Sequence, residues 1–166
     1  MYPTLDPKLI DTIFPNLDPS LFTLLNNRLN SFYEGQKKNG LETAADLVPT
    51  PDFVKVMLYS EYIAVNLSQN PSLYEKLINS GDLWLAYSDD TCFKRLEKAM
   101  NREPLEPAFV KETLLQFKLY ESIRIAWRDL AGTAGLEETM QDLSNLAEAC
   151  VQVGVDFLYE DLYRRL

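Results

Sequence analysis

The sequence predicts an all-α protein, an irregular bundle of about six helices that ends in a long antiparallel helix pair. On both sides of the glycine-containing junction at residues 132–135, apolar residues recur at spacings of three and four, and no stretch shows the alternation of a strand. Short connections of this kind usually join antiparallel neighbours. At three earlier places a capping residue is followed by proline, which is typical of helix starts. We expect residues 1–166 to form a single helical domain.

Three of the helices are expected in the first half of the chain, each opening on a capping residue and a proline. The middle one is apolar on most sides, which predicts burial all round. Gly40 and Gly81 are expected to stop the first and the third. Smaller helical turns are expected around Ile10–Phe14 and at residues 41–45. The three expected helices are Asp18–Lys37, 50–70 and 70–81.

The second half predicts three further helices, about Thr91–Met100, Ala108–Ala131 and Leu136–Arg165. Asp89 and Asp90 are expected to cap the first of them. Gly154 interrupts the apolar stripe of the last helix at a cost of about 1 kcal/mol relative to alanine, so we expect it to allow close packing against a neighbouring helix. The stripe comprises Met140, Leu143, Ala147, Cys150, Gly154, Leu158 and Leu162, with Leu136 before it.

Composition narrows the classes of function. The net charge of −9 and the absence of an obvious basic patch make nucleic acids and anionic membranes poor partners. No signal peptide and no apolar run long enough for a membrane span is present, so we expect a cytoplasmic protein. The chain has no histidine, which excludes histidine acid–base chemistry and the commonest zinc ligand. Cys92 and Cys150 are expected to be free thiols.

Five residues near the last helix junction are candidates for interaction or domain packing: Arg124, Trp127, Arg128, Glu137 and Glu138. The two arginines share one helix face and could bind an anionic partner. The alternative is that they form ion pairs with Glu137 or Glu138 and hold the two long helices together. Trp127, like Trp84 and Tyr120, is more typical of a core or interface. Asp89 and Asp90 are more typical of a helix cap than of a metal site.

Two segments resemble the bacterial glutamine synthetase adenylyltransferase/adenylyl-removing enzyme family. In that family an Arg-Ile-Ala-Trp-like run precedes Leu-Glu-Glu-Thr and Leu-Ser-x-Leu-Ala-Glu, shortly before the first nucleotidyltransferase domain. Here the runs read RIAWRDLAG at Arg124–Gly132 and LEETMQDLSNLAEA at Leu136–Ala149. The run NPSLYEKLINSGDL at Asn70–Leu83 is similar to a second family segment. Residues 1–47 carry no such motif.

The resemblance implies a larger enzyme that attaches AMP to a tyrosine of glutamine synthetase and removes it by phosphorolysis. Such enzymes use Mg²⁺ and ATP and respond to glutamine and to the PII signal-transduction protein. They carry Gly-x-Gly-Lys-Leu-Gly-Gly followed by Asp-x-Asp, which would hold the phosphates and Mg²⁺. This sequence contains neither motif. We therefore assign no catalytic, cofactor-binding or metal residue to it.

By this resemblance, the chain is expected to be the helical N-terminal portion of the enzyme and to be inactive alone. Its expected partners are its own nucleotidyltransferase domain, glutamine synthetase and PII. The alternative is an autonomous acidic helical module that binds a basic protein; a coding sequence that continues past Leu166 into the two motifs would separate these hypotheses. A small self-contained enzyme is not supported, because no carboxylates or tyrosines stand at a recognisable catalytic spacing.

Overall fold

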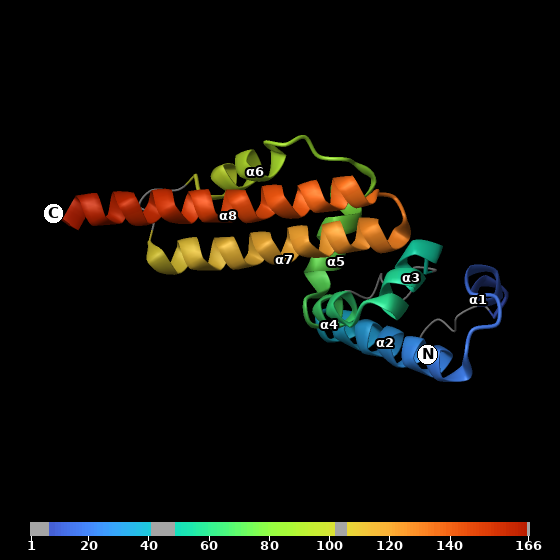
Figure 1. The fold of residues 1–166 in the computed structure, drawn as a ribbon. Coiled ribbons are helices and arrows are strands. Elements are labelled where there is room, and N and C mark those ends of the chain that lie inside the picture. Colours follow the sequence, from blue (N-terminus) through green and yellow to red (C-terminus); the bar gives the residue numbers. More distant parts are fainter. Residues whose placement is uncertain (1–6, 41–48, 102–105, 166) are drawn as a thin grey trace. The chain divides into compact units, whose positions relative to one another are not determined.

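The computed structural model describes residues 7–40, 49–101 and 106–165, which form eight α-helices and no β-strand (Figure 1). The predicted all-α class is confirmed. The chain divides into two compact units. Unit 1 runs to Leu83 and includes Leu130–Thr133, and unit 2 contains Trp84–Asp129 and Ala134–Leu166. The expectation of one folding domain stays a prediction, as does the turn at residues 41–45, which lies outside the described residues.

Unit 1 contains the first five helices, and two of the three expected starts form as predicted. The Asp18 carboxylate accepts a hydrogen bond from the Ser20 amide at 2.8 Å, and the Thr50 hydroxyl accepts one from the Phe53 amide at 3.3 Å. Asn70 holds the third cap position but makes no side-chain cap bond; its amide instead donates to the Asn66 carbonyl at 3.0 Å. The helices are α1 Pro7–Ile13, α2 Pro19–Lys38, α3 Pro51–Tyr59, α4 Glu61–Gln69 and α5 Pro71–Ser80.

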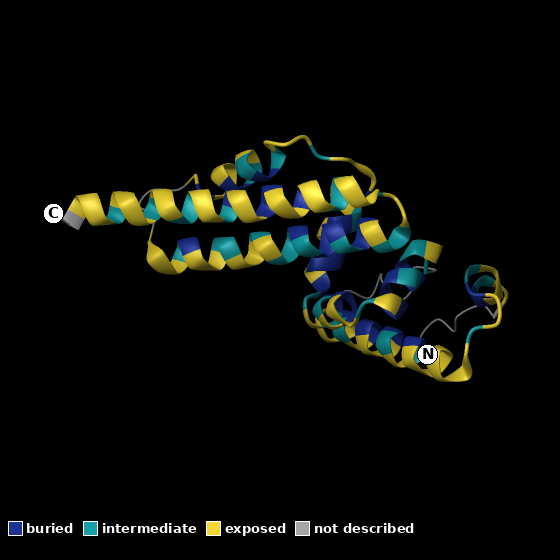
Figure 2. Cartoon of the chain, viewed as in Figure 1, coloured by how far each residue is buried: buried dark blue, intermediate teal, exposed yellow. Residues whose placement is uncertain are grey.

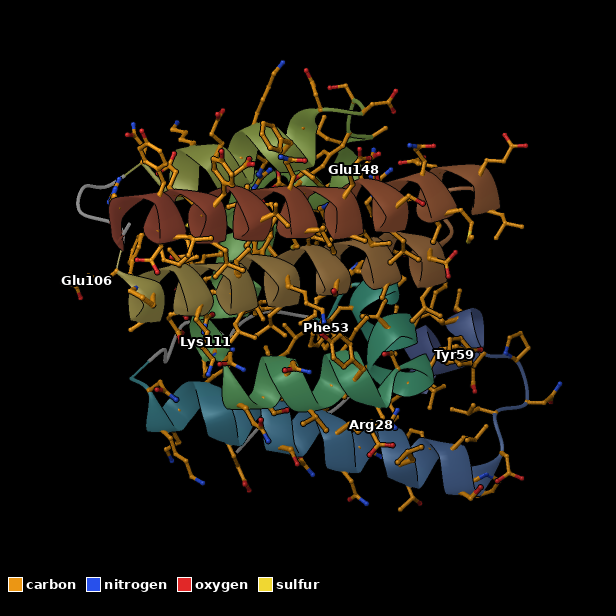
Figure 3. The ribbon with its side chains drawn as sticks, turned by 60° about the vertical axis from the view of Figure 1, so that its left-hand side comes forward. Arg28, Phe53, Tyr59, Glu106, Lys111 and Glu148 are labelled. Atoms are coloured by element: carbon orange, nitrogen blue, oxygen red, sulfur yellow. The ribbon has the colours of Figure 1, made fainter. Side chains whose placement is uncertain are left out.

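The single helix predicted over residues 50–70 is wrong, because the chain breaks at Ser60 into α3 and α4. The Ser60 hydroxyl caps α4 by accepting a hydrogen bond from the Ile63 amide at 3.1 Å. Arg28, labelled in Figure 3, reaches from α2 to the end of α3. Its Nη1 donates to the carbonyls of Met57 and Leu58 at 3.0 and 2.7 Å. The break is therefore stabilised from both sides, since both exposed helix ends find partners.

Burial all round is also wrong for this segment, because Tyr59, Tyr62 and Val65 are exposed. The other faces of α3 and α4 form the core of unit 1 with α2. The rings of Phe32, Phe53 and Tyr74 lie with centroids 5.1–5.3 Å apart, in tilted or edge-on contact.

Helices α2 and α4 of unit 1 approach each other closely at Gly35 of α2. A Cβ atom placed there would lie 2.1 Å from the carbonyl oxygen of Ser68 in α4. Only glycine fits this crossing, because the two backbones leave no room for a side chain.

Unit 2 contains α6 Thr91–Ala99, α8 Leu136–Arg165 and the part of α7 Pro107–Ala131 that runs to Asp129. The predicted aspartate cap of α6 is wrong in detail: Asp90 lies at the cap position but makes no cap bond, and its carboxylate pairs with Lys94 and Ser88. Trp84 is 61% exposed, so it does not belong to the core. The core comprises Cys92, Leu96, Met100, Val110, Ile125, Leu146 and Ala149.

Most members of the apolar stripe predicted on α8 lie on its outside. Exposed residues follow the whole length of α8 in Figure 2. The stripe members Met140, Leu143 and Leu158 are exposed, whereas Asp142, Asn145, Leu146 and Ala149 are buried. A Cβ atom at Gly154 would meet nothing within 4 Å. The close packing expected at Gly154 therefore does not occur within the described residues.

Candidate functional site

A buried ionic cluster joins α7 to α8 around Arg124. The Arg124 side chain is 0% exposed. Its Nε donates to Glu121 Oε2 at 2.7 Å, and its Nη2 donates to Asp142 Oδ2 at 2.6 Å. Glu121 lies one turn earlier on α7 and Asp142 lies on α8; both carboxylates are buried. The guanidinium therefore bridges two buried carboxylates through charge-assisted hydrogen bonds.

The surroundings of Arg124 keep its positive charge. Burial alone would lower the pKa of the guanidinium, but the hydrogen bonds and charges of Glu121 and Asp142 outweigh burial and raise its pKa. The Tyr87 ring stacks on the guanidinium, with Cζ 3.6 Å from the ring centroid. Among the described residues, Arg124 Nη1 has no hydrogen-bond partner. The ring face supplies a cation–π contact to this desolvated cation.

Arg95 extends the cluster from α6. Its Nε lies 3.7 Å from Glu121 Oε1, and its Nη1 donates to the Tyr87 hydroxyl. Its Cζ also lies 5.1 Å from the Tyr87 ring centroid and 5.7 Å from that of Tyr120. The ionic cluster, defined here as Tyr87, Arg95, Glu121, Arg124 and Asp142, thus connects all three helices of unit 2.

Two further contacts continue the α7–α8 connection toward the helix junction. Arg128 Nη2 donates to Glu138 Oε1 at 2.5 Å, and the Thr139 hydroxyl donates to Asp129 Oδ1 at 3.3 Å. Arg128 and Asp129, later in α7, contact Glu138 and Thr139, whereas Arg124, earlier in α7, contacts Asp142, which lies later in α8. That order is the one expected of antiparallel neighbours. The antiparallel course of both helices over their full length stays a prediction.

The five candidate residues lie as follows. Arg124, Trp127 and Arg128 are buried, Glu138 is the partner of Arg128, and Glu137 is exposed. The structure thus contains one of the ion pairs considered from the sequence. Because their side chains are buried, the two arginines present little charge at the surface. The roles of the five residues toward a partner stay predictions.

Sequence reasoning missed Asp142, although a signal for it was present. Arg124 and Arg128 are four residues apart on α7, and Glu138 and Asp142 are four apart on α8. Residues four apart lie on one helix face, so two such pairs of opposite charge on neighbouring helices can meet twice. Matching these spacings would have indicated both contacts.

The ionic cluster is typical of residues that hold packed helices together. Cys92, which packs near it, is not a candidate nucleophile, because burial and the nearby Glu121 charge raise the pKa of its thiol to about 12. Within residues 7–40, 49–101 and 106–165, no three acidic, cysteine or histidine side chains are placed to hold a metal. No helix of the described ranges is long and apolar enough to cross a membrane.

Comparisons with known proteins support the resemblance. A family model described as glutamate-ammonia ligase adenylyltransferase matches residues 50–166. A relative from Nitrosococcus oceani is 34% identical over 135 residues, covering 81% of this chain and 14% of the relative. One from Thioalkalivibrio sulfidiphilus is 30% identical over 156 residues, covering 94% and 15%. Both are named bifunctional glutamine synthetase adenylyltransferase/adenylyl-removing enzyme.

The chain spans only about one-seventh of the length of these relatives. No solved structure matches it. The matched residues contain α3 to α8 and with them the whole ionic cluster. Since the family model covers well over half of the sequence, the chain belongs to the glutamate-ammonia ligase adenylyltransferase family.

Proposed function

We propose that this chain is the N-terminal helical domain of an enzyme that adenylylates and deadenylylates glutamine synthetase. In this proposal it supports the adenylyl-removing half of the enzyme and carries none of the catalytic groups itself. The larger protein would use Mg²⁺ and ATP in the cytoplasm. Its own nucleotidyltransferase domain would be the first partner of this chain, and glutamine synthetase and PII would be further candidates.

The ionic cluster is the observation that carries the proposal. The family-like run at Arg124–Gly132 supplies two arginines, which are the residues best suited to bind a phosphate. Arg124 is instead held by Glu121 and Asp142, and Arg128 contacts Glu138. A guanidinium engaged by two buried carboxylates would have to break both contacts to bind a nucleotide. The family-like residues thus support a role in joining helices.

The absent sequence motifs point the same way. Phosphoryl and nucleotidyl transfer depend on positioned metal ions and on backbone donors close to the phosphates. The chain contains neither Gly-x-Gly-Lys nor Asp-x-Asp. Its adjacent pair Asp89–Asp90 directly precedes α6, and the Asp90 carboxylate pairs with Lys94. We therefore place the chemistry in the rest of the longer polypeptide.

An activity assay tests the proposal directly. The 166-residue chain is incubated with adenylylated glutamine synthetase, phosphate and Mg²⁺, and ADP release is measured. The longer protein serves as the positive control and unmodified glutamine synthetase as the blank. We expect ADP only with the longer protein, because that protein supplies the phosphate and metal groups. ADP formed by the 166-residue chain would refute the proposal.

A further inference from the structure

The side of α8 that faces away from the core of unit 2 carries a continuous apolar surface. Residues at spacings of three and four follow this side for most of the helix, and its large members are between 45% and 76% exposed. Figure 2 shows exposed residues along the full length of α8. We call this surface the outer stripe. It comprises Leu136, Met140, Leu143, Ala147, Val151, Gly154, Leu158 and Leu162.

The outer stripe is not needed to hold α8 in unit 2. A separate inner face already packs there through Leu146 and Ala149, with Val153 and Phe157 partly buried against the core. The same inner face carries Asp142, which binds Arg124. A surface helix normally has one apolar side. A second apolar side of this length is typical of a surface that another molecule or segment covers.

Gly154 indicates what kind of element fits the stripe. A glycine inside a helix costs about 1 kcal/mol relative to alanine, and nothing within 4 Å of a Cβ at Gly154 explains it in this chain. Ala147 lies seven residues earlier on the same side of α8. These two small residues leave room on one side of Val151, where a second helix can approach closely. The outer stripe therefore fits a helix crossing near Ala147 and Gly154.

The charges of α8 indicate which residues should flank the apolar face of the docking helix. Between Leu136 and Tyr163, α8 carries seven carboxylates and no lysine or arginine. Glu148, labelled in Figure 3, and Glu137 are exposed members of this set. A second copy of α8 would bring like charges together, which disfavours self-association. A helix with lysine or arginine beside its apolar face would be complementary.

We propose that the outer stripe of α8 is the docking face for a basic-flanked amphipathic helix from the part of the longer polypeptide outside residues 1–166. This inference rests on the proposed function. The matched part of this chain covers only 14% and 15% of these relatives, so most of such a polypeptide lies outside it. A helix in the same polypeptide is present at a high effective concentration, which favours this occupant over a separate protein.

Cysteine labelling measures whether the outer stripe is covered. Val151→Cys, on the stripe, and Gln152→Cys, one residue further and turned away from it, are compared in a Cys150→Ala background. The alkylation rate of each is measured in the 166-residue chain and in the longer protein. We expect Val151→Cys to react about tenfold or more slowly in the longer protein, because labelling then requires the docked helix to open. Gln152→Cys should react at similar rates in both.

Gly154→Ala gives a second test with opposite effects in the two proteins. In the 166-residue chain it should leave the denaturation midpoint unchanged or raise it, because the new methyl group meets open space. In the longer protein it should remove most of the protection of Val151→Cys, because that methyl group would meet the docked backbone. A folded 166-residue chain with this substitution excludes misfolding as the cause.

Equal labelling of Val151→Cys in both proteins would overturn the proposal. Protection that appears in the 166-residue chain alone and grows with its concentration would also overturn it, since a second copy would then cover the stripe. If either result is found while ADP release is still confined to the longer protein, the docking proposal is refuted and the proposed function is not affected. ADP release by the 166-residue chain would instead remove the proposed function.

Discussion

Replacing Arg124 with methionine should destabilise unit 2 strongly. Methionine keeps much of the length of the side chain but removes the charge that Glu121 and Asp142 share. Both carboxylates are buried and lie 2.7 and 2.6 Å from the guanidinium. The substitution leaves both carboxylates in a desolvated site without the Arg124 cation, and of the two, Glu121 keeps Arg95 Nε at 3.7 Å.

The magnitude follows from the distances. At an effective dielectric constant of about 20, each contact contributes roughly 6 kcal/mol of Coulomb attraction. The cost of taking each ion out of water is several kcal/mol, so the intact cluster contributes far less in net terms. Removing one partner keeps the cost and loses the attraction, which destabilises a protein by about 3–5 kcal/mol. We expect Arg124→Met to lose about that amount.

Tryptophan fluorescence during urea denaturation measures this loss within unit 2. The chain has two tryptophans, Trp84 and Trp127, and both lie in unit 2. Arg164→Met is the matched control, because Arg164 is exposed and pairs only with Glu160 at 3.5 Å among the described residues. It should change the free energy of unfolding by less than about 0.5 kcal/mol.

A triple variant separates stranded charge from lost packing. Glu121→Met and Asp142→Leu, added to Arg124→Met, remove the carboxylates together with the cation. Arg95 remains, but its side chain is 37% exposed, so its charge keeps contact with water. Replacing buried ionic groups with apolar residues is often neutral or stabilising, so we expect most of the loss to be recovered. A loss below about 1 kcal/mol, or a triple variant no more stable than the single one, would refute this account.

Three further predictions concern single contacts. Gly35→Ala should destabilise unit 1 by about 1–3 kcal/mol, because its Cβ would lie 2.1 Å from the Ser68 carbonyl oxygen. Faster amide exchange in α2 and α4 would show this destabilisation, and exchange at the wild-type rate would contradict the prediction. Arg28→Ala should cost about 1–2 kcal/mol in urea denaturation followed by circular dichroism, because two carbonyls near the end of α3 lose their hydrogen bonds from Nη1, whereas Lys37→Ala, at an exposed site, should cost little. Burial raises the pKa of the Cys92 thiol to about 12, so the thiol of the unfolded chain loses its proton first as the pH rises, and the free energy of unfolding falls above about pH 9. Cys92→Ala should reduce the slope of that fall by up to about 1.4 kcal/mol per pH unit, and an unchanged slope would count against the raised pKa.

The helix starts could be predicted from sequence where a single local interaction decides them. The oxygens of Asp18 and Thr50 lie next to the amides that they accept from, so a short sequence pattern suffices. The break at Ser60 was missed because no glycine or proline marks it. It depends partly on Arg28, whose donors come from about thirty residues earlier in the chain. A local pattern cannot contain such a contact.

The inward side of α8 could not be predicted because the helix has two apolar sides. Periodicity finds residues that share a side but does not say which side faces the core. The stripe through Met140 and Leu143 has the stronger pattern, yet the buried side includes Asp142. A buried aspartate is rare without a partner. Burial of this side therefore depends on Arg124 in another helix, which is a tertiary fact.

The two sides of α8 have different consequences for how the helix is positioned. Apolar contacts tolerate sliding, because leucine packs nearly as well one turn away. The Arg124–Asp142 contact does not, since a slip of one turn displaces its atoms by about 5.4 Å and removes the buried Asp142 carboxylate from the guanidinium. The Arg128–Glu138 contact would be lost in the same slip. The buried charges therefore fix the axial position of α8 against α7, and with it the position of Gly154 relative to α7 along the helix axis.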